Sequence, residues 1–309
     1  MDLKLGEKII RNISEVVVGK FEALELLLVG LLANGHVLLE DVPGVGKTLV
    51  AKSLAKSFNG VFKRIQFTPD LLPSDITGFN IYDQHSGKFI FQSGPVMTNI
   101  LLADEINRAI PRTQSSLLES MEERQVTVDG QTYMLPNPFF VLATQNPIEL
   151  EGTFPLPEAQ LDRFLLKIRL GYPNKEEEIS ILDRFQTEDP SDFISPVASP
   201  DMLIKMQSSR KRIVVSDPVK EYITDIVHAT RNSKSLLFGA SPRGSLGLMR
   251  ASQALAILRG REYVLPDDVK YLSRPVLGHR LILNEEERLR GHNTENVLEE
   301  IINHIPVPA

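Results

Sequence analysis

The chain has 309 residues, of which 42% are hydrophobic, so it can bury a sizeable core and is long enough for two domains. Lysine and arginine total 34 against 40 aspartates and glutamates, and this net charge of −6 leaves no overall positive field for nonspecific nucleic-acid binding. Cysteine is absent, which excludes disulfides, zinc-thiolate sites and thiol nucleophiles. The sequence has neither the long apolar run of a membrane span nor a secretion signal over residues 1–4, so we expect a cytoplasmic protein.

The first part of the chain alternates between apolar strands and amphipathic helices. Apolar residues at helical spacing predict helices over residues 3–17 and 21–33. The run 37–48 then reads as a buried strand, a glycine-rich turn and the start of a helix that continues to residue 58. A short strand is predicted over residues 62–67. This alternation indicates a parallel sheet that is covered on both faces.

The turn after the first strand has the layout of a nucleotide-phosphate cradle. Gly44 and Gly46 let backbone amides approach an anion, Lys47 can reach the β- and γ-phosphates, and Thr48 can offer its hydroxyl to Mg²⁺. The full pattern has glycine where this chain has Asp41, so the motif is matched with one departure. The alternative is an ordinary strand-to-helix turn. The turn therefore predicts an ATP or GTP site.

After the second strand the alternation stops. Segments 75–78 and 81–91 read as two short strands joined by a polar turn that contains glycine, hence as a hairpin inserted in the α/β core. A second hairpin is predicted over residues 125–134, where Asp129-Gly130 lies between two alternating strands. Because binding groups are commonly mounted on loops away from the core, both hairpins are candidates for contacting a client protein.

Polar side chains follow two further buried strands. The strand over residues 100–104 ends in Asp104 and Glu105, where the first acid can support Mg²⁺ through water and the second can orient or deprotonate an attacking water. The alternative is a helix N-cap followed by a solvated acid, which the preceding phosphate turn disfavours. The strand over residues 139–145 ends at Asn146, which could hydrogen-bond the γ-phosphate, although on local grounds a turn-forming asparagine is the better interpretation.

From Tyr172 onward the pattern changes to helices without an evident strand rhythm. We therefore predict a nucleotide-binding α/β core over residues 1–171 and a helical lid with a C-terminal tail over residues 172–309. Asn174 and Glu177 have the spacing of a capping box for the first of these helices. The predicted helices span residues 175–185, 201–208, 217–233, 241–259 and 266–277.

These motifs together resemble the MoxR family of AAA+ ATPases, which is related to the magnesium chelatase ATPase subunit. The resemblance covers most of the chain and follows the family's motif order. It rests on Val17-Val18-Gly19, the phosphate turn, Asp104-Glu105 with Asn107-Arg108, Ala143–Pro147, Pro155–Phe164 and Gly239–Gly244. It implies a P-loop AAA+ core with a parallel sheet and inserted hairpins, followed by a smaller all-helical lid.

The resemblance also implies roles for individual residues. Lys47 and Thr48 look like the Walker A pair, Asp104 and Glu105 look like the Walker B pair, and Asn146 looks like the sensor-1 residue. Thr48 and Asp104 would hold Mg²⁺. The nucleotide would contact Val17, Val18, Asp41, Val42, Pro43, Gly44, Val45, Gly46, Lys47, Thr48 and Leu49, with the two valines near the adenine.

Two arginines complete the site that the resemblance implies. Arg163 looks like the arginine finger, which would act on the γ-phosphate of a neighbouring subunit, although a salt bridge with Asp162 or another nearby acid is the alternative. Arg243 resembles the sensor-2 residue, which would reach ATP from the lid. Ser241 and Pro242 look like the N-cap and first residue of a helix, and a cation in the first turn is disfavoured unless an anion lies there.

The family implies an ATPase that works as a ring, a hexamer, with ATP and Mg²⁺. Hydrolysis would change the angle between core and lid and so drive chaperone-like assembly, activation or metal loading of a client protein complex, with a von Willebrand factor A domain protein as a partner. The alternatives are a DNA-remodelling motor, which the acidic balance opposes, and a binding module that senses ATP without hydrolysis, which the presence of Glu105 opposes.

Overall fold

The centre of the protein is a five-stranded parallel sheet, seen here in a computed structural model that describes residues 5–147, 152–186 and 194–308. The strand order is β2-β5-β8-β1-β9. The strands are β1 (Val37–Glu40), β2 (Phe62–Gln66), β5 (Ile100–Asp104), β8 (Phe140–Gln145) and β9 (Leu166–Ile168). The predicted parallel sheet is confirmed. Strand β9 was not predicted, because its three residues are too few to show a period.

Helices cover both faces of this sheet. In β8, Phe140 and Leu142 pack with one set of helices, whereas Val141 and Ala143 pack with the other. Both faces of β8 are therefore buried, which explains its uninterrupted apolar sequence. The first set is α1 (Leu5–Ser14), α2 (Phe21–Leu32) and α3 (Lys47–Ser57), and the second includes α4 (Pro73–Thr77) and α5 (Pro111–Glu123). The short α6 (Glu158–Leu161) follows later in the chain.

Two antiparallel hairpins interrupt the α/β pattern, as predicted. The first consists of β3 (Gly78–Asp83) and β4 (Lys88–Ser93), and the second of β6 (Gln125–Val128) and β7 (Gln131–Met134). The prediction of a strand over residues 75–77 is wrong, because these residues belong to α4. Pro73 occupies its first turn and the Asp75 carboxylate accepts a hydrogen bond from the Leu72 amide at 2.9 Å, which favours a helix start.

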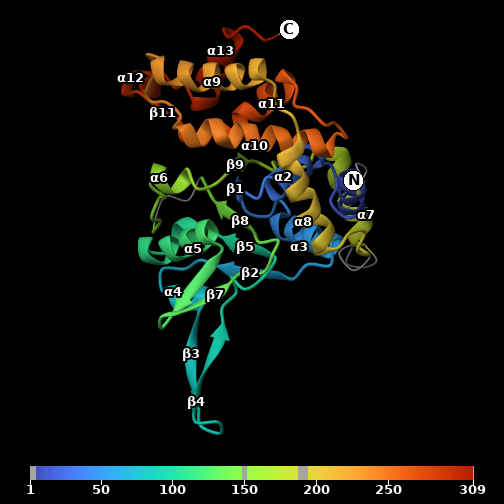
Figure 1. Cartoon of the computed structure of the whole chain (residues 1–309), viewed down its shortest axis with the longest axis vertical. Coiled ribbons are helices and arrows are strands. Elements are labelled where there is room, and N and C mark those ends of the chain that lie inside the picture. The colour runs from blue at the N-terminus through green and yellow to red at the C-terminus, as the bar shows by residue number, and fades with distance from the viewer. Residues whose placement is uncertain (1–4, 148–151, 187–193, 309) are drawn as a thin grey trace.

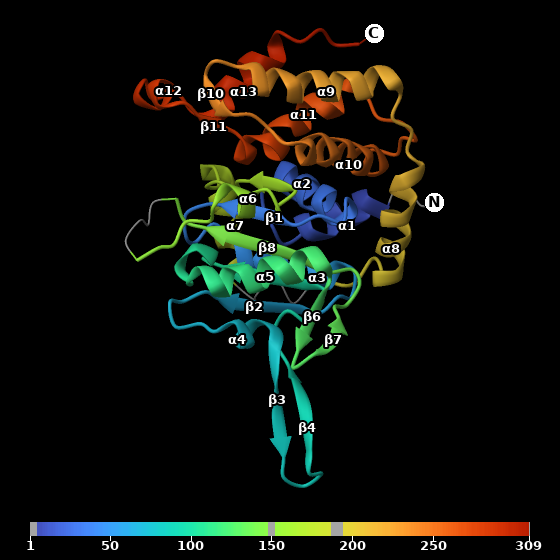
Figure 2. The same cartoon turned by 60° about the vertical axis from the view of Figure 1, so that its left-hand side comes forward.

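The β3–β4 hairpin projects far from the body, at the end of the molecule opposite the C-terminal helices (Figures 1 and 2). The second hairpin lies beside its base (Figure 2). The rings of Phe91 and Tyr133 stack with centroids 3.9 Å apart, and the Asn80 side-chain amide donates to the Asp129 carboxylate at 2.7 Å. These contacts join the two hairpins into one projecting unit.

The part of the chain after Tyr172 is mainly helical, and its five predicted helices are present to within one residue at each end. The Asn174–Glu177 capping box is confirmed. The helices are α7 (Lys175–Phe185), α8 (Pro200–Ser209), α9 (Asp217–Asn232), α10 (Pro242–Leu258), α11 (Pro266–Leu277), α12 (Glu285–Leu289) and α13 (Thr294–Asn303), with a 3-10 turn over Gly278–Arg280. The region is not all helical, however, because β10 (Leu236–Phe238) pairs with β11 (Ile282–Leu283).

The C-terminal helices pack directly against the core. Helix α10 lies on α2, and the buried side chains of α10 and α11 belong to the same apolar cluster as those of α1, α2 and α3. Because the two predicted domains share one apolar cluster, the boundary between core and lid near Tyr172 stays a prediction. None of the helices in the described part of the chain combines the length and the apolar composition that crossing a membrane requires. Residues 3–4 of the first predicted helix lie outside the described residues.

Candidate functional site

A cavity of ≈ 610 Å³ lies where the carboxyl ends of the central strands meet the glycine-rich turn. Most of the residues predicted from sequence to bind or process a nucleotide line it together. The lining consists of Val16, Val17, Val18, Lys20, Pro43, Gly44, Val45, Gly46, Lys47, Thr48, Leu49, Arg64, Gln66, Asp104, Glu105, Asn146, Pro173, Ile181, Arg184 and Phe185. A crevice at the carboxyl edge of a parallel sheet is the usual ligand site of open α/β folds.

The glycine-rich turn is shaped to receive an anion. Gly44 has φ 85° and Gly46 has φ 89°, and a Cβ built on either would meet nothing within 4 Å. The glycines are therefore required by backbone conformation rather than by packing. Gly46 is the N-cap of α3, and no side chain caps its first amides, so these donors can face a ligand at the positive end of the helix. Lys47 donates from Nζ to the Asp41 carbonyl oxygen at 2.9 Å.

Asp41, which replaces the first glycine of the motif, has a different task from the one predicted. Its buried carboxylate accepts hydrogen bonds from the Leu170 amide at 2.5 Å and the Gly171 amide at 3.0 Å. It therefore ties the end of β1 to the loop after β9. Asp41 and Val42 are not among the residues that line the cavity, so their contact with a nucleotide stays a prediction.

Asp104 is held by two partners on the neighbouring strands. Its Oδ1 accepts from the Thr144 hydroxyl at 2.6 Å, and its Oδ2 accepts from Arg64 at 2.6 Å. Arg64 was not predicted as a site residue. A polar side chain near the end of an edge strand that pairs with β5 is the signal that could have identified it. The arginine places a positive charge against this acid.

Glu105 sits in a strained backbone conformation and is held by a different set of partners. Its φ of 56° and ψ of 51° are left-handed, which a residue other than glycine adopts only with support from its surroundings. Its amide donates to the Thr144 hydroxyl at 2.8 Å, and its carboxylate accepts from Gln66 at 2.6 Å and Arg108 at 2.9 Å. The acid is thereby directed into the cavity beside Asn146.

Helix α7 forms part of the wall of the cavity, together with Val17 and Val18. Its residues Ile181 and Phe185 line the cavity and were not predicted from sequence. Arg184, also unpredicted, donates to the Glu15 carbonyl oxygen at 2.5 Å and so anchors α7 to the end of α1. The amphipathic spacing of α7 was visible in the sequence, but that spacing does not reveal which element the helix will face.

Arg163 and Arg243 lie in a separate cavity of ≈ 340 Å³ that includes none of the turn residues, Asp104 or Glu105. Both arginines pair with the same acid, since Arg163 Nε and Arg243 Nη2 each lie 3.4 Å from a Glu122 carboxylate oxygen. The predicted capping geometry of α10 is confirmed, with Ser241 as N-cap and Arg243 in the first turn. Arg243 is not among the residues that line the nucleotide cavity, so its role in reaching ATP from the lid stays a prediction.

Comparisons with known proteins agree with the geometry of the site. A model for the "ATPase family associated with various cellular activities (AAA)" matches residues 36–166, and a model for the AAA lid domain matches residues 228–301. The chain is 52% identical to the uncharacterised protein YeaC of Bacillus subtilis, over 98% of this chain and 94% of that protein. It is 45% identical to the chaperone MoxR1 of Mycobacterium tuberculosis, over 98% of this chain and 82% of that protein.

A solved structure has nearly the same fold. The crystal structure of a proposed ATPase from Cytophaga hutchinsonii superposes with a TM-score of 0.94 and 41% sequence identity, over 99% of this chain and 96% of that one. The fold, the phosphate turn and the acid pair thus agree with a nucleotide-hydrolysing protein.

Proposed function

The chain belongs to the MoxR family of AAA+ ATPases, and we propose that each of its ATP-hydrolysing sites is shared between adjacent subunits of a ring, a hexamer. The observation that carries this proposal is the separation of the two cavities. One contains the phosphate turn and the acid pair, and the other contains Arg163 and Arg243. In this proposal each chain would carry both halves of a site for phosphoryl transfer, and a neighbour would bring the second half to the first.

The first cavity suits ATP with Mg²⁺. The turn amides and Lys47 would bind the phosphates, while Val17, Val18 and the α7 side chains would enclose the base. Thr48 and Asp104 line the same cavity and offer the oxygen ligands that Mg²⁺ prefers, so these residues fit the ion. When bound, Mg²⁺ would neutralise part of the phosphate charge.

Glu105 would act as the base that orients and deprotonates the attacking water. A hydrogen bond from Gln66 and an ion pair with Arg108 hold the carboxylate in place, and Asn146 would position the water or the γ-phosphate from the end of β8. Strands β2, β5 and β8 end at one edge of the sheet, so Gln66, Glu105 and Asn146 would converge on one side of the phosphate.

The arginines would come from the neighbouring subunit. Arg163 and Arg243 share one counter-ion, Glu122, whose carboxylate is about half exposed, so an incoming phosphate could take over both guanidinium groups. An arginine placed this way raises the rate of phosphoryl transfer by about 10³ to 10⁵. The sequence analysis predicted that Arg243 reaches ATP from the lid, and this proposal adds that the ATP is bound by the neighbouring subunit.

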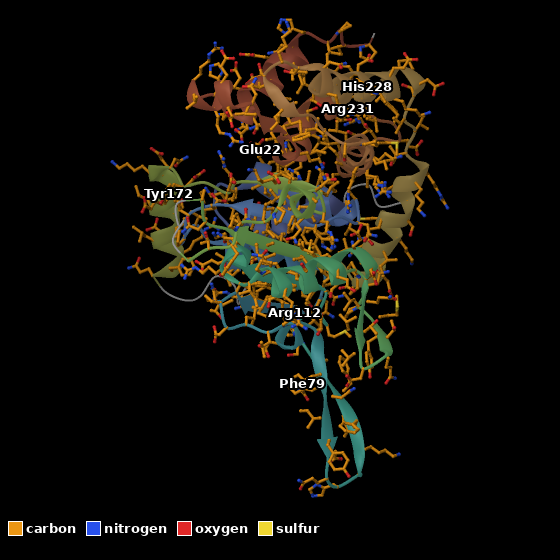
Figure 3. The ribbon with its side chains drawn as sticks, turned by 90° about the vertical axis from the view of Figure 1, so that its left-hand side faces the viewer. Glu22, Phe79, Arg112, Tyr172, His228 and Arg231 are labelled. Carbon is orange, nitrogen blue, oxygen red and sulfur yellow. The ribbon has the colours of Figure 1, made fainter. Side chains whose placement is uncertain are left out.

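The ATPase would perform chaperone-like work on a client protein complex, by assembling it, activating it or loading a metal. One relative at 45% identity carries the name chaperone. The projecting hairpin exposes large apolar side chains, among them Phe79, Phe89 and Ile90, and Figure 3 shows Phe79 on this hairpin near its base. Exposed apolar side chains on a projection favour contact with a protein, and a von Willebrand factor A domain protein remains our candidate partner.

The same hairpin does not favour the alternative of a DNA-remodelling motor. Along β3, β4 and their turn, Lys88 is the single lysine or arginine, and Asp83 pairs with it in register. Binding to a nucleic-acid backbone needs several cations on one surface. The chain's net charge of −6 points in the same direction.

The shared site is tested by mixing two inactive variants. Lys47→Ala removes the phosphate-binding half and Arg163→Ala removes the arginine half, so each alone should lose most hydrolysis. In mixed rings, roughly a quarter of the interfaces would combine an intact turn with an intact arginine, and phosphate release should recover to that level. Arg290→Gln, which removes an exposed arginine paired with Glu286, is the control and should remain active. A mixture that stays as inactive as its components would contradict the shared site.

A further inference from the structure

We propose that Arg280 is a positioning residue that holds Arg163 and Arg243 at the spacing needed to grip one phosphate. The proposal rests on the shared site proposed above. Arg280 itself touches neither the nucleotide cavity nor Glu122 among its described contacts. It acts through the segment that carries Arg163 and the helix that carries Arg243.

Arg280 is buried against residues 162–165, the segment that carries Arg163. Its side chain is 3% exposed, and Nε donates to the Asp162 carboxylate at 2.6 Å. Its other nitrogens donate to the carbonyl oxygens of Phe164 at 2.7 Å, Leu165 at 3.2 Å and Asp162 at 3.3 Å, and to that of Val276. A guanidinium is buried at tolerable cost only when its donors are paired in this way. The backbone on both sides of Arg163 is therefore fixed to the end of α11.

The same network reaches the helix that carries Arg243. The second oxygen of the Asp162 carboxylate accepts from the Ser241 hydroxyl at 3.3 Å. Ser241 caps α10, since its Oγ accepts from the Arg243 amide at 3.2 Å. Gly244 permits close packing here, because a Cβ at that position would lie 3.0 Å from Leu277 and 3.7 Å from Arg280. One carboxylate thus links the buried arginine, the Arg163 segment and the start of α10.

The two functional arginines need this support because their direct link is weak. Glu122 pairs with both at 3.4 Å, and its side chain is 46% exposed, so the pairs alone would add little stability in water. Two like charges also repel when no phosphate lies between them. The segment that carries Arg163 and the start of α10 must therefore be fixed by other contacts, which Arg280 and Asp162 supply. Loss of that support would misplace the arginines, and a displacement of about 1 Å can lower a rate roughly 100-fold.

The experiment uses Arg280→Gln and the milder Asp162→Asn in the full chain. We expect kcat to fall roughly 10- to 100-fold, because the arginines lose their alignment. Binding of a fluorescent ATP analogue should stay within about twofold of the native value, because the variant's own nucleotide cavity is intact. Mixing either variant with Lys47→Ala should restore activity, since the Lys47→Ala chains supply properly held arginines to their neighbours.

The control is Arg259→Gln, which removes ion pairs at the other end of α10, with Glu25 at 3.1 Å and with Asp268 of α11 at 3.6 Å. It should retain native kcat, because it lies at the far end of α10 from Arg243. If Arg280→Gln and Asp162→Asn are as active as this control, Arg280 has no positioning role.

The mixing result separates this inference from the shared site. If Lys47→Ala rescues Arg163→Ala but rescues neither positioning variant, the shared site stands and the role of Arg280 is wrong. If Lys47→Ala rescues none of them, the shared site itself is wrong. Should Arg280→Gln fail to fold or to bind the ATP analogue, Asp162→Asn decides the question by the same criteria.

Discussion

Two neighbouring acids at the end of β5 are held by different groups, which suits them to different tasks. Arg64 and Thr144 hold Asp104, whereas Gln66 and Arg108 hold the Glu105 carboxylate. The left-handed backbone at Glu105 turns its side chain away from the direction that the strand would give it. In the proposed function, Asp104 would support Mg²⁺ and Glu105 would act on water.

Replacement of Glu105 by glutamine should separate binding from hydrolysis. The amide has the same size and keeps a hydrogen-bonding oxygen, but it cannot accept the proton of water, so we expect phosphate release to fall about 10² to 10⁴-fold. A fluorescent ATP analogue should bind with native affinity. Glu286→Gln, an exposed acid of α12, serves as control. Turnover near the native rate in Glu105→Gln would show that another group activates the water.

We expect the buried His36 to make stability depend on pH. Burial, together with the charge of Arg124, holds the pKa of His36 well below its ordinary 6.5, while Nε2 donates to the Met121 carbonyl and Nδ1 accepts from the Val141 amide. In the unfolded chain the ring takes up a proton below that value, so the unfolded state binds more protons. Stability should therefore fall as the pH drops from about 7 to about 5.

Urea unfolding at a series of pH values measures this effect. His36→Gln should be less stable than the native chain near pH 7 but should lose less stability on acidification. Some dependence would remain, because burial also lowers the pKa of His279. His228→Gln, which replaces an exposed histidine, should leave the native slope unchanged. An equal slope in His36→Gln would mean that His36 does not contribute.

At the scale of elements, α7 rather than the later helices encloses the nucleotide cavity. The helix packs closely on the chain before α2, where Gly19 has φ 71°. A Cβ at Gly19 would lie 2.0 Å from the Glu177 carboxyl carbon, so a side chain there would displace the carboxylate that accepts from the Asn174 amide at the start of α7.

Gly19→Ala should therefore weaken ATP binding. We expect the KM for ATP to rise about tenfold with kcat little changed, because the enclosure of the base is disturbed while the acids and the turn are not. Gly291→Ala is the matched control, since Gly291 has φ 79° but nothing within 4 Å of an added Cβ. It imposes the same backbone strain without the clash and should leave KM unchanged. Equal effects of the two variants would assign the change to strain alone.

Much of the element pattern followed from the sequence, with gaps that have physical causes. The Asp-Gly turn of the second hairpin and the five later helices were predicted correctly, because turn residues, caps and apolar spacing are local signals. Helix α5 was not predicted, and β9 is too short to show a pattern. The pairing of β10 with β11 joins segments far apart in the chain, so no local signal marks it.

At the scale of the whole molecule, the proposed ring makes activity depend on assembly. If Arg163 and Arg243 serve a neighbour, dilution that dissociates the subunits should lower phosphate release per chain, whereas ATP should favour reassembly. Specific activity measured over a range of protein concentrations, beside light scattering, tests this expectation. Constant specific activity in a sample that scatters as a single chain would contradict it.

The sequence by itself determined the phosphate turn and the acid pair, because each depends on local backbone conformation and because parallel strands end at a common edge. Asn146 was predicted only through the family resemblance, since its local sequence also suits a turn. Tertiary structure alone decided that Arg163 and Arg243 lie together in a second cavity and that Asp41 faces the loop after β9. The physical reason is that apolar spacing shows that one side of a helix is buried but does not show which element covers that side. That choice depends on the packing of α10 on α2 and on buried polar contacts such as those of Arg280.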